Sequence, residues 1–211
     1  MRQALKLGDF STRLSANYDR NANSNGLKDV SLAGDLVESS NADDLSVSYD
    51  VSHSFADKNT NVKLTANAQG NRLSAEYDQA DGLTEVSAER DVDVGDRSVN
   101  LQPSWLVNAK TARVKLMSKL NGGDSVSAQV DYATDGGDVT TEVSYDHNLE
   151  AGRDISATLK PGSKQLDVDY VDNKFENGAT WTASASVPFE NSGSSNLLDA
   201  AKVTLKRSWA W

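Results

Sequence analysis

The stretch Leu45-Ser46-Val47-Ser48-Tyr49-Asp50-Val51-Ser52-His53-Ser54-Phe55 alternates apolar and polar side chains without interruption. Successive side chains of a β-strand point to opposite faces of its sheet, so this period of two gathers the apolar side chains on one face and the polar ones on the other. A helix needs apolar residues every three or four positions, and no window of the chain shows that period convincingly. The stretch therefore predicts a two-faced strand.

The same alternation recurs along most of the chain. Between the runs stand residue pairs that tolerate positive φ, as tight hairpins require. The spacing between runs, roughly 12 to 16 residues, leaves no room for the helix that joins parallel strands, so neighbouring strands are expected to be antiparallel. The further runs are Val62–Ala68, Leu73–Tyr77, Val99–Val107, Ala112–Leu116, Val126–Tyr132, Val139–Tyr145, Ile155–Leu159, Leu166–Tyr170, Trp181–Phe189 and Val203–Trp211. The intervening pairs are Asn25-Gly26, Asp81-Gly82, Gly122-Gly123, Gly136-Gly137, Pro161-Gly162 and Asn177-Gly178.

These patterns predict an all-β fold, an antiparallel up-and-down meander of about fourteen amphipathic strands. At 211 residues the chain fits a single all-β domain, residues 1–211. Two segments, Val86–Asp96 and Glu190–Asn196, are expected to be irregular, and neither resembles a domain linker. The motifs Leu14–Asp19, Leu45–Asp50 and Leu73–Asp78 are variants of one theme, which predicts a hairpin as the repeating unit.

Composition excludes several classes of protein. The net charge of −10 argues against nucleic acid as a partner, because phosphate binding needs clustered lysine and arginine. Cysteine is absent, which rules out a disulfide-stapled fold, thiolate metal sites and cysteine nucleophiles.

No catalytic or cofactor site is expected. The segment Asp91–Asp96 resembles the start of a calcium loop, but Gly95 stands where a ligand is needed, and Leu101 where the loop needs a bidentate glutamate. The two histidines, His53 and His147, both fall on the apolar side of their strands and are interpreted as packing or strand-end residues. The serines are explained by the polar strand face, so the chain is not expected to be an enzyme, and no metal or cofactor is predicted.

The polar face is mainly acidic and carries two candidate groups of basic residues. Arg113, Lys115 and Lys119 share one strand face, and Lys202 and Lys206 share that of the last strand. If the polar face lines a pore, its lumen is mainly acidic and carries opposed charge patches, with these basic residues as the positive ones. If it faces bulk water, it is an ordinary solvated surface. The acidic residues are Asp50, Glu76, Asp78, Asp131, Glu142, Asp146, Asp167 and Asp169.

A single apolar face must be covered, either by lipid around a closed barrel or by a second sheet or partner in a soluble fold. In its alternation, strand length and final run, in which Val203, Leu205, Trp209 and Trp211 lead to a terminal aromatic, the chain resembles outer-membrane β-barrels, including plastid outer-envelope channels. The resemblance implies a closed barrel in an outer membrane or plastid envelope, in contact with lipid, that forms a small-solute or ion pore. Trp209 and Trp211 would be the closing-strand aromatics.

Other features favour a soluble fold. Tyr49 lies in the middle of its strand, and the aromatic residues do not form two obvious girdles. Arg207 departs from the barrel pattern, because it occupies an outward position between Leu205 and Trp209. Arginine that faces lipid is costly at the midplane and cheap near the interface, so Arg207 either lies near a membrane boundary or contradicts a membrane span. A soluble structural sheet that serves as an extrinsic or scaffold subunit of a larger complex, with other subunits as partners, satisfies the same alternation. A carrier of a lipophilic ligand is a further alternative. The closed barrel is favoured over an open sheet or sandwich.

Overall fold

The computed structural model describes residues 2–7, 10–18, 26–38, 45–150, 152–176, 178–189 and 201–209. These residues group into two compact units, each of which is described by itself. Unit 1 comprises Met1–Asp91 and Gln102–Ala112, and unit 2 comprises Val92–Leu101 and Arg113–Trp211. No helix among the described residues is long and apolar enough to cross a membrane.

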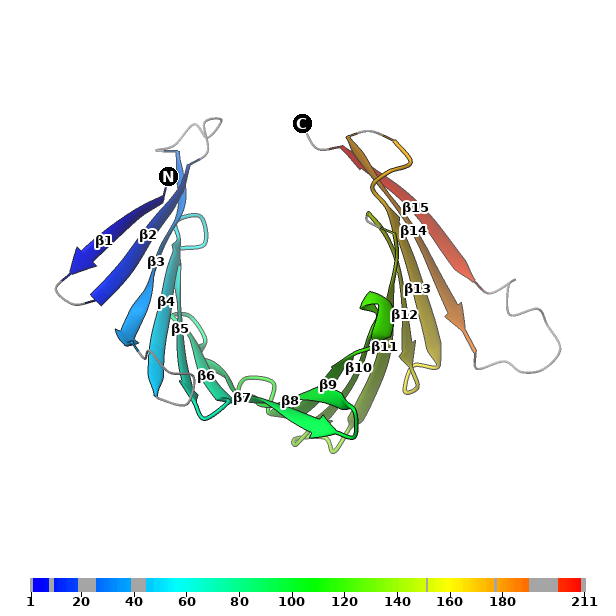
Figure 1. Ribbon diagram of the computed structural model, residues 1–211, viewed down its shortest axis with the longest axis horizontal. Helices are drawn as coiled ribbons and strands as arrows, with labels where there is room; N and C mark the ends of the chain where they lie inside the picture. Colours follow the sequence, from blue (N-terminus) through cyan, green and yellow to red (C-terminus); the bar gives the residue numbers. More distant parts are fainter. Residues whose placement is uncertain are drawn as a thin grey trace. The chain divides into compact units, whose positions relative to one another are not determined.

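The described residues form one sheet of 15 strands in the order of the chain, β1 to β15. In Figure 1 the described strands of each unit lie side by side in the order of the chain. The predicted all-β antiparallel meander is confirmed. The strands are β1 (Arg2–Leu7), β2 (Phe10–Tyr18), β3 (Leu27–Val37), β4 (Ser46–Ser54), β5 (Asn59–Ala68), β6 (Asn71–Asp78), β7 (Gly82–Val94), β8 (Arg97–Leu106), β9 (Thr111–Lys119), β10 (Ser125–Ala133), β11 (Val139–Glu150), β12 (Arg153–Lys160), β13 (Gln165–Asp172), β14 (Ala179–Pro188) and β15 (Lys202–Trp209), with a short 3₁₀ turn η1 (Asn121–Gly123) before β10.

The preference for a closed barrel is not supported. The strand order is linear, and among the described residues β1 is joined only to β2 and β15 only to β14. The described residues form 15 strands, against the predicted count of about fourteen. In a meander closed end to end, an odd number of strands would join the first and last strands as a parallel pair.

The strand register confirms the predicted alternation. Residues directly opposite each other in an antiparallel pair lie on the same face. Across β3–β5 the apolar side chains of Leu32, Val51 and Val62 stand opposite one another. Across β12–β14 those of Ala157, Val168 and Ala185 do the same. Each unit therefore has one continuous apolar face and one polar face, as the period of two predicts.

The expectation that Val86–Asp96 is irregular is wrong, because most of this segment lies in β7, the 13-residue strand Gly82–Val94. The cause of the broken pattern is a β-bulge. Glu76 pairs with Glu85 whereas Tyr77 pairs with Leu83, which leaves Thr84 as an extra residue. The hydroxyl of Thr84 donates to the carbonyl oxygen of Glu76 at 3.1 Å. The inserted residue shifts the apolar phase by one position, and a strict period-two pattern fails there.

The motif theme found in the sequence recurs on alternate strands. Its copies fall on β2, β4 and β6, which agrees with a hairpin as the repeating unit. Most predicted reversals are confirmed by positive φ angles at their glycines, for example +66° at Gly26 and +78° at Gly178. The turn between β5 and β6 was not among the predicted reversals, although both strands were predicted. Its two turn residues, Gln69 and Gly70, have φ of 51° and 71°, which is the geometry of a type I′ turn.

Gly70→Ala should lower the free energy of unfolding by about 1 kcal/mol, because Gly70 has a positive φ that L residues with a Cβ adopt at a cost. The effect is conformational alone, since no atom lies within 4 Å of the added Cβ. Gly162→Ala is the matched control. Its surroundings are equally open and its φ is not positive, so alanine there should be neutral or slightly stabilising. Equal losses in denaturant titrations of the two variants would contradict the assigned turn geometry.

The described residues form a single layer, and almost nothing in it is buried. Every substantial contact between strands that are described together joins sequence neighbours. Ala179 is the one buried hydrophobic residue among the described positions, with 4% of its surface exposed, whereas Leu73 is 56% exposed and Leu205 is 66% exposed. A folded soluble monomer hides such side chains in a core. The apolar face of each unit is therefore left without cover by the rest of its unit.

Candidate functional site

The polar face of unit 1 carries a row of charges that crosses four strands, here called the acidic row. Asp50 stands opposite Lys63, Lys63 opposite Glu76, and Glu76 opposite Glu85. The Lys63 ammonium donates to Glu76 at 2.6 Å, and both side chains are more than 40% exposed. Three carboxylates thus share one lysine in the row. This excess of acid, facing water, attracts cations.

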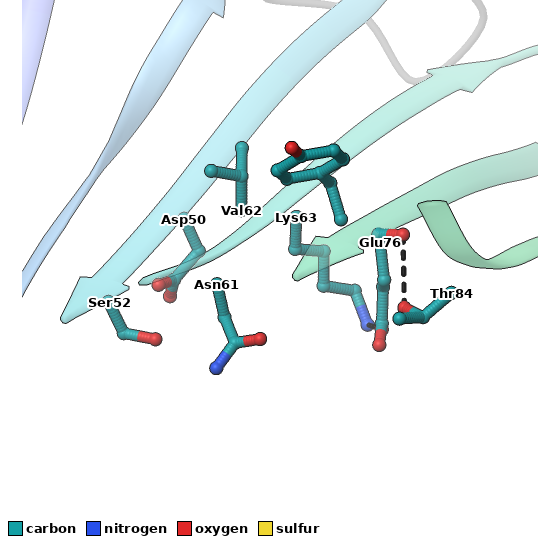
Figure 2. Close-up of a pocket in the computed structure, with 8 residues that line it drawn as sticks. Asp50, Ser52, Asn61, Val62, Lys63, Glu76 and Thr84 are labelled. Atoms are coloured by element: carbon teal, nitrogen blue, oxygen red, sulfur yellow. Dashed lines mark hydrogen bonds and ion pairs between the residues drawn. The ribbon is translucent and has the colours of Figure 1, made fainter. Parts of the chain in front are cut away.

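Two shallow hollows flank the acidic row, one of about 240 Å³ and one of about 210 Å³. Figure 2 shows Lys63, Asn61 and Glu76 on one side of the sheet, while Val62 points to the other side. The second hollow extends to Arg72 and Glu89, which approach to 3.9 Å. The lining of the second hollow is almost entirely polar, whereas the first also includes the apolar side chains of Val62 and Tyr77.

The polar face of unit 2 is held together by cross-strand ion pairs. Lys160 on β12 donates to Asp167 on β13 at 2.9 Å, and Gln165 donates to the same carboxylate at 2.6 Å. Ser184 on β14 donates to Asp169. Most of the acids that the sequence assigned to one face are therefore in contact with donors on neighbouring strands, and the face is ordered as well as polar.

The candidate basic residues do not form one patch. Arg113 makes a two-pronged ion pair with Asp131, with both nitrogen–oxygen distances at 2.8 Å. Lys115 and Lys119 follow on the same strand, β9, while Lys202 and Lys206 lie on β15 and are exposed. Five strands separate β9 from β15 in the sheet, which corresponds to roughly 29 Å at the usual strand spacing. The two groups belong to different regions of the polar face.

Of the two candidate closing-strand aromatics, only Trp209 lies among the described residues. The backbone of Trp209 ends β15 and pairs with Ala179, and Trp211 lies outside the described residues. The aromatic residue that the structure does place at this end is Trp181 on β14, which sequence reasoning had counted only as one member of an apolar run.

The two histidines lie on the apolar face, where the sequence placed them. The Nδ1 of His53 is 2.9 Å from the hydroxyl oxygen of Thr60. The Nδ1 of His147 is 2.5 Å from Asp124, which follows η1, and the hydroxyl of Tyr145 donates to the same carboxylate at 2.6 Å. The Tyr145 hydroxyl first, and the His147 ring second, hold the pKa of Asp124 below its usual range. These contacts fasten η1 to β11.

No group of three or more histidine or carboxylate side chains that could hold a metal occurs among the described residues. The calcium-like segment forms the end of β7 and a tight turn, with Gly95 at a φ of +64°. It is thus accounted for as a hairpin.

Tyr49 lies in the middle of the apolar face and has a partner for its hydroxyl. Tyr49 stands opposite Gly34, which stands opposite Thr12, and the Tyr49 and Thr12 hydroxyl oxygens are 3.1 Å apart. The tyrosine ring therefore reaches across β3 at Gly34. Thr12 is only 5% exposed. A polar group in the centre of an apolar face is acceptable in hydrocarbon when it is hydrogen-bonded in this way.

Thr12→Val should cost about 1 kcal/mol of unfolding free energy in detergent or lipid, because it leaves the Tyr49 hydroxyl without its partner. Tyr49→Phe should cost a similar amount. The double variant should cost less than the sum, because it removes donor and acceptor together. Strict additivity in this double-mutant cycle would show that the hydroxyl pair contributes nothing.

A second cluster closes one end of the apolar face of unit 2. Arg153, Asp172, Trp181 and Arg207 stand opposite one another across β12–β15, and this set is called the edge row. It contains Arg207, the residue whose outward position argued against a membrane. The structure places Arg207 near the end of β15, opposite Trp181, and Glu176 of the β13–β14 loop accepts a hydrogen bond from its guanidinium.

Comparison with protein-family models and with curated proteins gives no match to this chain.

Proposed function

We propose that this protein is an outer-membrane-type β-barrel that forms a pore for ions or small solutes. Its apolar face contacts lipid and its mainly acidic polar face contacts water. The observation that carries the proposal is a single-layer sheet whose continuous apolar face has no cover within its own unit. Hydrocarbon is an environment in which such a face is stable without a second protein layer.

The dimensions of the strands support a membrane span. A tilted strand of about 9 to 11 residues crosses a bilayer. The described strands from β2 onward have between 8 and 13 residues, among them β4 and β10 with 9 each and β5 with 10. Most are therefore long enough to reach from one interface to the other.

The chemistry of the polar face supports a pore with weak cation preference. The acidic row carries three carboxylates for one lysine. In unit 2, Asp169 accepts a hydrogen bond from the neutral hydroxyl of Ser184. Fixed negative charges along an aqueous path raise the local concentration of cations, and added salt screens the effect.

Closure of the sheet is part of the proposal, and it requires an unusual seam. Because the 15 strands alternate in direction, β1 and β15 would meet as a parallel pair, unless a further strand lies between them. The chain has no native cysteine, so introduced pairs report cleanly on the seam. Cysteines scanned along Arg2–Leu7 against Lys202–Trp209 should cross-link in membranes in a parallel register. Cross-linking in no pair would contradict direct closure.

The test of the function is reconstitution. Full-length protein should require detergent for extraction from membranes, and in planar bilayers it should conduct small ions with a modest cation preference that falls as salt rises. Glu76→Gln with Glu85→Gln should reduce that preference, and Ser74→Ala on the same face is the matched control that should leave it unchanged. A protein that stays in solution without detergent and conducts no ions would refute the pore.

A soluble scaffold subunit is the second candidate, and the open strand order favours it. Among the described residues β1 and β15 each have one neighbour, so both outer edges are available to pair with strands of another chain. In that case a partner protein covers the apolar face, and the chain should be extracted without detergent together with that partner and should not insert into vesicles.

A further inference from the structure

We infer that the edge row of unit 2, Arg153, Asp172, Trp181 and Arg207, lies in the headgroup layer of a phospholipid bilayer and marks one boundary of the membrane. This inference rests on the proposed function and deepens it, because it names the lipid layer that this end of the sheet contacts. It is carried by where the charges stand on the apolar face and by how each one is partnered.

The carboxylate of Asp172 is fully supplied with donors at this boundary. It accepts from Arg153 at 3.1 Å and from the hydroxyl of Tyr170 at 3.0 Å. The backbone N–H groups of Lys174 and Phe175 donate to it at 2.7 and 2.8 Å. Asp172 is 5% exposed. An acid that is neutralised and hydrogen-bonded in this way is suited to the margin of a region from which water is excluded.

Trp181 and Arg207 form an amphipathic pair beside it. The guanidinium of Arg207 lies 5.2 Å from the centre of the Trp181 ring, and the indole N–H donates to Glu176 at 3.2 Å. Phe175 packs edge-on against the same ring, with centroids 5.8 Å apart. The indole ring therefore contacts Phe175 and the Arg207 guanidinium while its N–H meets a carboxylate, an amphipathic arrangement that suits tryptophan at a membrane interface.

The rows farther along the apolar face contain no charge across β12–β15 as described. The next two rows are formed by Ile155, Tyr170, Ala183 and Leu205, and then by Ala157, Val168, Ala185 and Val203. A further row holds Leu159, Leu166 and Val187. Charges on a lipid-facing surface are costly at the midplane and cheap near the interface. Because the charges of this face are confined to the edge row, that row lies near the interface.

The apolar rows extend from the edge row into the apolar band. From Asp172 to Leu166 the chain advances about 20 Å along β13, and from Trp181 to Val187 about 20 Å along β14. At a strand tilt of about 40° this covers roughly 15 Å along the membrane normal, within an apolar band of about 25 Å. With the edge row at one margin, the rows of Val168 and Leu166 therefore lie inside the hydrocarbon layer.

The test is a depth scan along β14 in vesicles of phosphatidylcholine. Single cysteines at positions 181, 183, 185 and 187 carry a nitroxide, and its exposure to oxygen and to a water-soluble nickel complex gives its depth. Ser184→Cys and Ser186→Cys on the opposite face are matched controls that should report water. We expect the greatest depth at position 185 and headgroup depth at position 181. In a second measurement, Trp181 is the sole tryptophan after phenylalanine replaces Trp105, Trp209 and Trp211, and shallow brominated lipids should quench it more than deep ones.

The outcomes separate the inference from the function. Insertion with position 181 as deep as position 185 would overturn the boundary and leave the barrel standing. Water exposure at all four apolar-face positions, with no quenching of Trp181 by any brominated lipid, would refute membrane embedding itself. A face protected from water without contact with lipid would assign it to a protein partner and would also overturn the inference.

Discussion

Val168→Arg should lower the free energy of unfolding in lipid by about 2–4 kcal/mol, or prevent insertion altogether. Val168 stands in the central row of the apolar face, between Ala157 and Ala185, and in the proposed barrel a guanidinium there would face the bilayer midplane. Val171→Arg is the matched control, because it lies in the same strand but pairs with Asp154 and Thr182 on the polar face. That variant should fold nearly as well as the parent.

The measurement is denaturant-induced unfolding of vesicle-embedded protein, followed by tryptophan fluorescence. Tyr170→Arg, one row nearer the edge row, should show an intermediate loss, because the cost falls with distance from the midplane. Val168→Arg would also destabilise a soluble sheet whose apolar face packs on protein, but there the loss would not change gradually from one row to the next. Equal losses at positions 168 and 170 would therefore contradict a lipid-facing surface.

The period of two was sufficient to predict the sheet, its antiparallel order and the composition of both faces. It succeeded because each face is uniform, so a strand such as β4 declares its orientation by itself. It failed at β7, where Thr84 is inserted as a bulge, and it did not find β3, where Lys28 and Leu36 are similar register shifts and Gly34 interrupts the apolar set. A bulge changes the phase without any distinctive residue, so alternation alone does not reveal it.

The candidate sites were less predictable, because they depend on register between strands. The sequence placed Arg113 on the polar face, but its pairing with Asp131 depends on how β9 and β10 align. Arg207 appeared out of place from its own strand. Only the alignment of β12–β15 shows that it shares a row with Arg153, Asp172 and Trp181. The apparent exception to the apolar face is thus part of a charged and aromatic margin.

Closure could not be settled from alternation, because an open and a closed sheet bury the same residues on the same faces. The structure adds that the strand order is open and that the number of described strands is odd. The choice between a pore and a scaffold therefore depends on whether the terminal strands β1 and β15 join, and not on the composition of the two faces.

If the protein is the proposed barrel, deleting Arg207–Trp211 should abolish membrane assembly, lowering the membrane-inserted fraction by about tenfold or more. The deletion removes three of the eight residue pairs that join β14 to β15, those of Ala179, Thr180 and Trp181. It also takes away the guanidinium that binds Glu176 and lies over Trp181.

Deleting residues 210–211 alone is the matched control, because it keeps every described β14–β15 pair. Insertion is measured as the fraction of protein that stays with vesicles after alkaline extraction. Under the barrel hypothesis a larger fraction of the protein should insert after the short deletion than after the long one, because the short deletion keeps the end of β15 that pairs with β14. A soluble sheet predicts a different result. There the long deletion frays one edge strand, costs a few kcal/mol through lost apolar burial, and leaves a water-soluble product. Soluble and folded protein after the long deletion would therefore favour the scaffold over the pore.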